Sequence, residues 1–357
     1  MSPPDTAPGP GAGRPPAAVI FGCAGPRLDA DEAAFFRDAD PLGFILFARN
    51  CETADQIRGL TGALRDSVGR ADAPVLIDQE GGRVARLKPP LGHIVPPARR
   101  FGDLYARDTA AGRAAAHAAG RLIAGDLAAL GIDVDCAPVL DLARPETTAA
   151  IGDRAFAADP VIVAVLGRAL AEGLLAGGVL PVIKHMPGHG RARVDSHAEL
   201  PMVAAGPAAL AAADFAPFHA LADLPLGMTA HVRYDALDPT LPATLSAAVI
   251  AGTIRGEIGF DGLLLSDDLA MEALTGTHGA RAAQALAAGC DIALHCTGQR
   301  GDMQDVAGHV APMTPDAVRR WRAARDRIAG TRLPVTVENG ADTADPAAIL
   351  AEAFAEP

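Results

Sequence analysis

The chain has 357 residues, which suits either two ordinary domains or one large α/β barrel. Half of the residues are hydrophobic and 21% are charged, a composition that excludes global disorder. The formal net charge of −12 argues against a nucleic-acid binder, which needs a basic face. We therefore expect a soluble protein with a small or neutral ligand.

The N-terminal segment 1–17 is rich in Pro, Gly and Ala and lacks the basic and apolar regions of a secretory signal. We expect a short disordered lead there, followed by one domain over residues 18–357. No apolar run is long enough to span a membrane. The five cysteines are widely spaced and form no CxxC pair, which favours a reducing compartment over a disulfide framework. We expect a cytoplasmic monomer.

After residue 17, short apolar runs alternate with longer Ala-rich amphipathic stretches. The apolar runs predict eight buried strands, which are Ala18–Cys23, Gly43–Phe47, Pro74–Asp78, Asp133–Ala137, Leu180–Lys184, Leu226–Ala230, Gly262–Ser266 and Asp291–His295. The amphipathic stretches predict helices that include Thr53–Val68, Thr109–Leu130, Pro160–Ala176, Pro207–Leu221, Ser246–Ile258 and Ala280–Gly289. Two more helices, Pro315–Gly330 and Asp345–Ala355, are expected to pack on the outside.

Eight buried strands that alternate with helices imply a parallel sheet and predict an α/β fold, a single (β/α)8 TIM-type barrel. The alternative is an open doubly wound sheet. It is disfavoured because no GxGxxG motif follows the first strand, where the sequence is Gly22 to Pro26.

Unusual polar residues follow several of the predicted strands. They lie within the segments Asp78–Arg86, Ile151–Arg154, Lys184–His197, Met228–His231 and Ser266–Met271. Because catalytic residues of a barrel gather at the carboxyl ends of its strands, these segments predict the active site.

Asp267 and Asp268 follow the apolar run 263–265 at the end of the seventh predicted strand. Side chains alternate along a strand, so one carboxylate can face the barrel mouth while the other packs or caps the next helix. The alternative is that both carboxylates cap the helix that begins near Leu269.

Asp195 and His197 lie two residues apart in a predicted loop. Such a pair can place a carboxylate against an imidazole nitrogen, which fixes the tautomer and raises the basicity of the ring. Gly188 and Gly190 are expected to let this loop bend and move. The alternative is a surface loop with a chance histidine.

Charged and polar side chains near the other strand ends suit a ligand rich in oxygen atoms. Lys184, followed by His185, ends a buried run, where a lysine is costly unless it is paired or used. It can donate to ligand hydroxyls or form a Schiff base. Arg86 and Arg154 are fixed donors, and Asp78 can accept two hydroxyl hydrogen bonds from a sugar. Surface ion pairs or a loop cap are the alternatives.

A metal site built from His185, His189 and His197 is disfavoured. The first two histidines have the spacing of a helical zinc pair, but Pro187 and Gly188 between them break a helix. We expect no metal and no cofactor.

These motifs together resemble glycoside hydrolase family 3 and, within it, the bacterial β-N-acetylglucosaminidases of peptidoglycan recycling. The matching segments are Lys184–Gly190 with Asp195–His197, Asp78–Arg86, Ile151–Phe156 and Ser266–Met271. Met186 stands where the family usually has Phe, and Ala155 where it has Ser. The resemblance covers about residues 18–300.

The resemblance implies a role for each matching position. Asp267 is the implied nucleophile that forms a covalent glycosyl-enzyme. His197 is the implied general acid/base, with Asp195 as its orienting partner. The implied substrate is a small sugar, N-acetylglucosamine linked to a 1,6-anhydro-muropeptide. The residues implied to hold this sugar are Asp78, Arg86, Arg154, Lys184 and His185.

Three rival functions stay open at this point. One is a β-glucosidase or a glycoside phosphorylase of the same family. Another is a lyase that forms a Schiff base on Lys184. The third is a sugar-binding barrel without catalysis, which the presence of both Asp267 and His197 disfavours.

Overall fold

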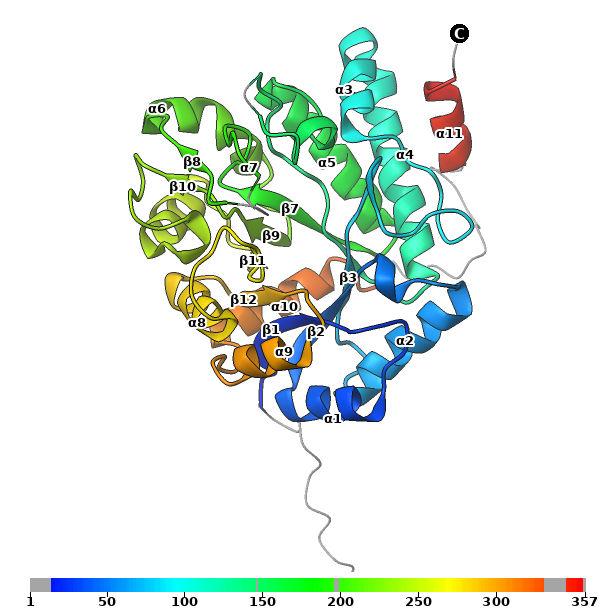
Figure 1. Ribbon diagram of the computed structural model, residues 1–357. Helices are drawn as coiled ribbons and strands as arrows, with labels where there is room; N and C mark the ends of the chain where they lie inside the picture. The colour runs from blue at the N-terminus through cyan, green and yellow to red at the C-terminus, as the bar shows by residue number, and fades with distance from the viewer. Residues whose placement is uncertain (1–13, 146, 196–198, 331–344, 356–357) are drawn as a thin grey trace, which may run out of the picture.

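The computed structural model describes residues 14–145, 147–195, 199–330 and 345–355. Within them, parallel strands close a barrel in the order β1-β12-β11-β9-β7-β6-β3-β2, which confirms the predicted fold class (Figure 1). The barrel strands are β1 Ala17–Gly22, β2 Pro41–Leu46, β3 Val75–Ile77, β6 Val134–Asp135, β7 Leu180–Met186, β9 Leu226–Thr229, β11 Leu263–Asp268 and β12 Ile292–His295. Each overlaps one of the predicted runs.

Two small sheets lie outside the barrel and were not predicted. Their strands are β4 Gln79–Gly81 with β5 Val84–Ala85, and β8 Met202–Val203 with β10 Arg233–Tyr234. Both follow barrel strands, so they shape the loops at the carboxyl ends.

Helices surround the barrel. They are α1 Ala30–Ala39, α2 Ala54–Ser67, α3 Ala98–Arg107, α4 Thr109–Ala128, α5 Pro160–Ala176, α6 Pro207–Ala209, α7 Ala216–Ala220, α8 His278–Ala288, α9 Arg300–Ala307, α10 Pro315–Asp326 and α11 Pro346–Ala353. Several begin where a side-chain oxygen accepts a hydrogen bond from a backbone N–H of the first turn, as Thr53, Asp108 and Asp159 do. Among the described residues, no helix has the length and apolar character needed to cross a membrane.

Two predicted helices differ from the structure. The stretch predicted as one helix over 207–221 is divided into α6, the π-helical segment η3 Leu210–Asp214 and α7. The stretch predicted over 246–258 is the π-helical segment η5 Val249–Glu257. Amphipathic periodicity does not distinguish these winding patterns, because each buries one face of the segment.

Alternation along the strands divides the core into two layers. In β1, Ala18 and Ile20 belong to the barrel interior, whereas Val19 and Phe21 pack under the helices. Trp321 of α10 joins the interior cluster. The strands thereby form a packed scaffold that leaves their carboxyl ends for a ligand.

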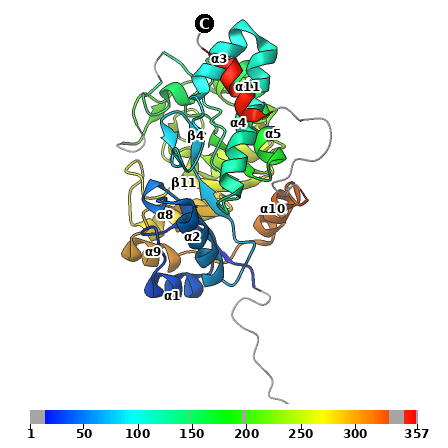
Figure 2. The same ribbon diagram turned by 90° about the vertical axis from the view of Figure 1, so that its right-hand side faces the viewer.

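The two C-terminal helices have different positions (Figures 1 and 2). Helix α10 was expected on the outside, but it closes the N-terminal end of the barrel. The reason is that Pro312, just before it, pairs with Ala17 at the start of β1. Helix α11 packs against the outer helices as predicted, and its following Phe354 meets Phe101 edge-on at 5.0 Å. Residues 1–13 of the predicted lead lie outside the described residues.

Candidate active site

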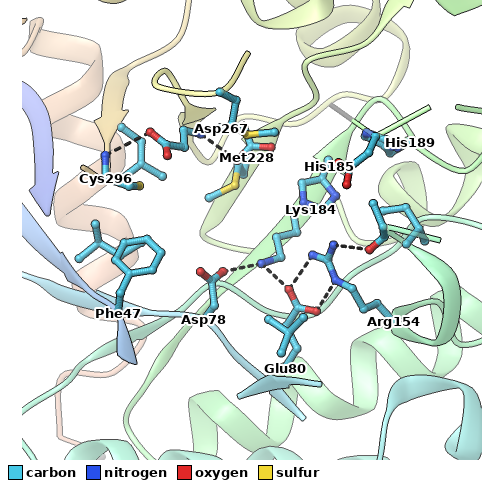
Figure 3. A pocket seen from close by; sticks show the side chains of 18 of the residues that line it. Phe47, Asp78, Glu80, Arg154, Lys184, His185, His189, Met228, Asp267 and Cys296 are labelled. Carbon is cyan, nitrogen blue, oxygen red and sulfur yellow. Dashed lines mark hydrogen bonds and ion pairs between the residues drawn. The ribbon is translucent and has the colours of Figure 1, made fainter. Parts of the chain in front are cut away.

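A pocket of about 280 Å³ opens at the carboxyl ends of the barrel strands (Figure 3). This volume is at the small end of ligand sites, which hold roughly 300–1,000 Å³. All of the predicted site residues that the structure describes line it, namely Asp78, Arg86, Arg154, Lys184, His185, Asp195 and Asp267. The pocket is therefore where sequence patterning placed it, although the roles of its residues stay predictions.

One wall of the pocket is a chain of alternating charges (Figure 3). Lys184 Nζ lies 2.8 Å from Asp78 Oδ1 and 2.7 Å from Glu80 Oε1. Arg154 forms a bidentate pair with Glu80, with both N···O distances at 2.8 Å. Arg86 Nη2 lies 3.1 Å from Asp78 Oδ2. These pairs hold each side chain in one geometry, which suits recognition of a ligand with several hydroxyls.

The ion pairs determine the charge of Lys184. Burial alone would lower the pKa of its ammonium group, but the carboxylates of Asp78 and Glu80 raise it above its ordinary value. Burial would likewise raise the pKa of Asp78, whereas Lys184 and Arg86 lower it. Lys184 is therefore protonated at neutral pH, and a protonated amine is not the nucleophile that a Schiff base requires.

Asp267 stands at the end of β11 and faces the pocket (Figure 3). Its Oδ1 accepts a 2.8 Å hydrogen bond from the Asp268 N–H. Burial would raise the pKa of Asp267, but His185 and that N–H lower it below its ordinary value. The carboxylate is thus ionised at neutral pH, as a nucleophile must be.

Asp268 has a different environment. Its Oδ1 accepts hydrogen bonds from Ala270 N at 3.0 Å and Cys296 N at 3.1 Å, which join the loop after β11 to the end of β12. Burial raises the pKa of Asp268. Both carboxylates line the pocket, but their environments differ: the pKa of Asp267 is lowered, whereas Asp268 accepts hydrogen bonds from two backbone N–H groups and its pKa is raised.

His185 is oriented by a buried carboxylate that sequence reasoning missed. Its Nδ1 lies 2.7 Å from Asp141 Oδ2, and the other oxygen of Asp141 accepts from His189 N at 2.6 Å. His185 charge lowers the pKa of Asp141 against the opposing effect of burial, so the carboxylate can only accept. His185 therefore donates through Nδ1 and leaves Nε2 for the pocket. Burial also lowers the pKa of His189, to about 4.

His231 supports the strand that carries Asp267. Its Nε2 donates to the Asp268 carbonyl at 2.9 Å, and its Nδ1 lies 2.8 Å from Thr244 Oγ1. The ring is fully buried, and burial lowers its pKa. His231 is therefore a neutral positioning group. The sequence signal for His231 was its position at the end of the sixth predicted strand. For Glu80, the signal was its position within the Asp78–Arg86 motif.

The loop with the predicted acid/base pair is described only in part. Asp195 lines the pocket, whereas Ser196 and His197 lie outside the described residues. The glycines before this loop are tightly packed. A Cβ on Gly190 would meet Leu142 O at 2.4 Å, and Gly188 O accepts a 2.7 Å hydrogen bond from Tyr234. These contacts show that both glycines allow close packing, and their role as a hinge stays a prediction.

An ionised carboxylate beside a rigid set of charged donors, at the strand ends of a barrel, is a site built to hold and cleave a polar ligand such as a glycoside. Comparison with known proteins identifies the family to which this site belongs. The family model described as glycosyl hydrolase family 3 N terminal domain matches residues 23–320. The chain belongs to this family.

Named relatives support the same assignment. A beta-hexosaminidase from Alkalilimnicola ehrlichii is 42% identical over 282 residues, which cover 78% of this chain and 80% of the relative. The structure of NagZ from Neisseria gonorrhoeae in complex with N-trifluoroacetyl-D-glucosamine has a TM-score of 0.75 at 34% identity, covering 90% of this chain and 99% of that one.

A family 3 β-N-acetylglucosaminidase from Paenibacillus has a TM-score of 0.81 at 30% identity, covering 94% of this chain and 66% of that one. Together with the family assignment, these relatives identify the chain as a glycoside hydrolase of the β-N-acetylhexosaminidase type.

Proposed function

We propose that this enzyme is a retaining, exo-acting β-N-acetylglucosaminidase. The observation that carries the proposal is an ionised Asp267 facing a small pocket whose opposite wall is the charge chain of Lys184, Asp78, Glu80 and Arg154. A pocket of about 280 Å³ closed by fixed charges suits one terminal sugar ring, with the leaving group outside. A relative that binds N-trifluoroacetyl-D-glucosamine is consistent with this sugar.

In the proposed first step, Asp267 attacks the anomeric carbon and forms an ester with the sugar. The bond from that carbon to the leaving oxygen breaks, and His197 gives this oxygen its proton. In the second step, a water molecule attacks the same carbon, His197 takes the proton of the water, and the Asp267 carboxylate is released. Asp195 orients the imidazole for both transfers.

The charge chain would hold the sugar during both steps. Lys184 and Arg154 can donate to sugar oxygens while keeping their carboxylate partners, because each has more N–H groups than these ion pairs use. His185 can contribute Nε2, since Asp141 occupies its other nitrogen. The wall is rigid before substrate binds, so little ordering remains to be done in the transition state.

For the leaving group, we propose a 1,6-anhydro-N-acetylmuramic acid, with or without its peptide, as met in cytoplasmic recycling of peptidoglycan. The resemblance of the motifs supports this choice. The Schiff-base alternative is disfavoured by the two carboxylates on Lys184. No observation favours a glucosidase or a phosphorylase over the hydrolase.

Release of p-nitrophenol tests the proposal. We expect the enzyme to cleave the p-nitrophenyl N-acetylglucosaminide far faster than the glucoside, with a rate that added inorganic phosphate leaves unchanged. Faster cleavage of the glucoside would favour a glucosidase. A phosphate-dependent rate with a sugar phosphate as product would favour a phosphorylase.

A further inference from the structure

Three side chains with metal-binding atoms meet outside the active-site pocket. They are His278 in the first turn of α8, His295 at the end of β12 and Asp302 in α9. One ligand atom from each lies within 4.8 Å of the other two. Over the described parts of the chain, this is the one group of three or more such side chains with that property. The packed helices α8 and α9 bring it together (Figure 1).

The distances within the group suit a shared cation. His278 Nδ1 lies 3.4 Å from Asp302 Oδ1, which is long for a charge-assisted hydrogen bond. Two ligands at ~2.0–2.1 Å from a tetrahedral zinc ion are about 3.3–3.4 Å apart. His295 reaches the same carboxylate through Thr297, whose Oγ1 lies 2.9 Å from His295 Nε2 and 3.4 Å from Asp302 Oδ2.

Burial and access also fit a metal. His295 is fully buried, and its Nδ1 has no hydrogen-bond partner among the described residues. Its ring lies 5.0 Å from that of His278, centroid to centroid. His278 and Asp302 keep side-chain exposures of 25% and 37%, so an ion can reach the group from solvent. A buried imidazole beside a second imidazole and a carboxylate is more readily explained as a ligand than as packing.

The neighbours of the group are already engaged. Asp305 Oδ2 accepts a 2.7 Å hydrogen bond from Gly279 N, which fixes the start of α8 beside His278. The nearby Arg281 donates through Nη1 to Leu269 O and Met271 O in the loop after β11. An ion held by the group would therefore fasten α8 to β12 and α9 and, through Arg281, the loop that follows Asp267.

We propose that His278, His295 and Asp302 bind a divalent transition-metal ion with the ligand preference of Zn²⁺. Two imidazoles and one carboxylate are a common zinc ligand set, and water would take the fourth position. None of the three residues lines the active-site pocket. The proposed ion lies outside the glycosidase site and links α8, β12 and α9, and it departs from the expectation that the chain needs no metal.

Zinc binding by the full chain tests the proposal. Chelator-treated protein is dialysed against Zn²⁺, and bound metal is counted for the wild type, His278→Ala and Asp302→Asn. The matched control is His309→Ala, because His309 Nδ1 also lies 3.4 Å from a carboxylate, that of Asp305, in a partly exposed pair. A pocket histidine that binds zinc would be counted equally in every variant.

We expect the wild type and His309→Ala to hold one ion more than His278→Ala and Asp302→Asn, or to bind it at least about tenfold more tightly. Zinc should raise the thermal unfolding midpoint of the first two proteins and not of the other two. Visible absorption of bound Co²⁺ typical of tetrahedral coordination should follow the same division. Equal binding by all four proteins, or none by the wild type, would overturn the proposal. Two partly exposed ligand positions are tested so that one misfolded variant does not decide the result.

Discussion

Replacing Lys184 with methionine would remove the ammonium group between the buried Glu80 carboxylate and the partly buried Asp78 carboxylate while keeping a side chain of similar length. Lys184 is 2% exposed and lies 2.8 Å from Asp78 and 2.7 Å from Glu80. Breaking one buried pair by removing a partner typically costs about 3–5 kcal/mol, because the remaining charge is uncompensated. Arg86 and Arg154 still neutralise part of the charge of the two carboxylates. We therefore expect the free energy of unfolding to fall by an amount in this range rather than by twice as much.

The same substitution should change how stability depends on pH. In the wild type, the pKa values of Asp78 and Glu80 are lowered against the effect of burial, chiefly by Lys184. Their contribution to stability is present above the ordinary carboxyl pKa and is lost as pH falls through the folded-state values. In Lys184→Met, burial should raise both pKa values, so that stability is lost as pH rises. The difference between the two proteins should therefore be smaller at pH 5 than at pH 8.

Urea unfolding at the two pH values, followed by circular dichroism, measures this difference. The matched control is Arg168→Met, which removes the cation of an exposed pair with Asp223 and should cost about 1 kcal/mol or less. The reasoning is refuted if Lys184→Met unfolds at the urea concentration of the control, or if its loss of stability is the same at both pH values.

The remaining predictions concern catalysis. Asp267→Ala should lower kcat by about 10⁴–10⁶-fold with an unchanged fold, which turnover assays and circular dichroism would check; a smaller loss in this variant than in Asp268→Ala would contradict the assignment. His197→Ala should lose ~10²–10⁴-fold on a natural disaccharide but much less on a p-nitrophenyl glycoside, whose leaving group needs no proton, and Asp195→Ala should show the same pattern more weakly. Single-turnover rates that fall equally on both substrates would mean that His197 only supports its loop. Arg154→Ala should weaken kcat/KM by about 1.5–3 kcal/mol, and a near-normal value would remove Arg154 from the site.

The fold could be predicted because each barrel strand is an apolar run between turn or polar residues. Strand ends were less predictable. β6 contains only Val134–Asp135, whereas β7 continues through the polar Lys184 and His185 to Met186. Hydrogen bonding between neighbouring strands determines where each strand ends. The sequence of one strand does not show which strands pair with it. The position of α10 depended likewise on pairing between Pro312 and Ala17.

The site could be predicted as far as it follows strand ends. Its partners could not, because they are distant along the chain. Asp141 lies 44 residues before His185, and Glu80 lies 74 residues before Arg154. Asp141 and Glu80 each contribute through contact with another side chain, and the spacing of residues along the sequence does not reveal such contacts. The packing role of Gly188 was missed for the same reason, since its neighbour Asp214 comes from another segment.

The central claim is that Asp267 forms a covalent bond to the sugar, and trapping that intermediate tests it most directly. The enzyme is treated with a 5-fluoro N-acetylglucosaminide that carries a good leaving group, digested, and mapped by mass spectrometry. We predict one added sugar per chain, attached to Asp267 and absent from Asp267→Ala. A label on Asp268 or on any other residue would contradict the account.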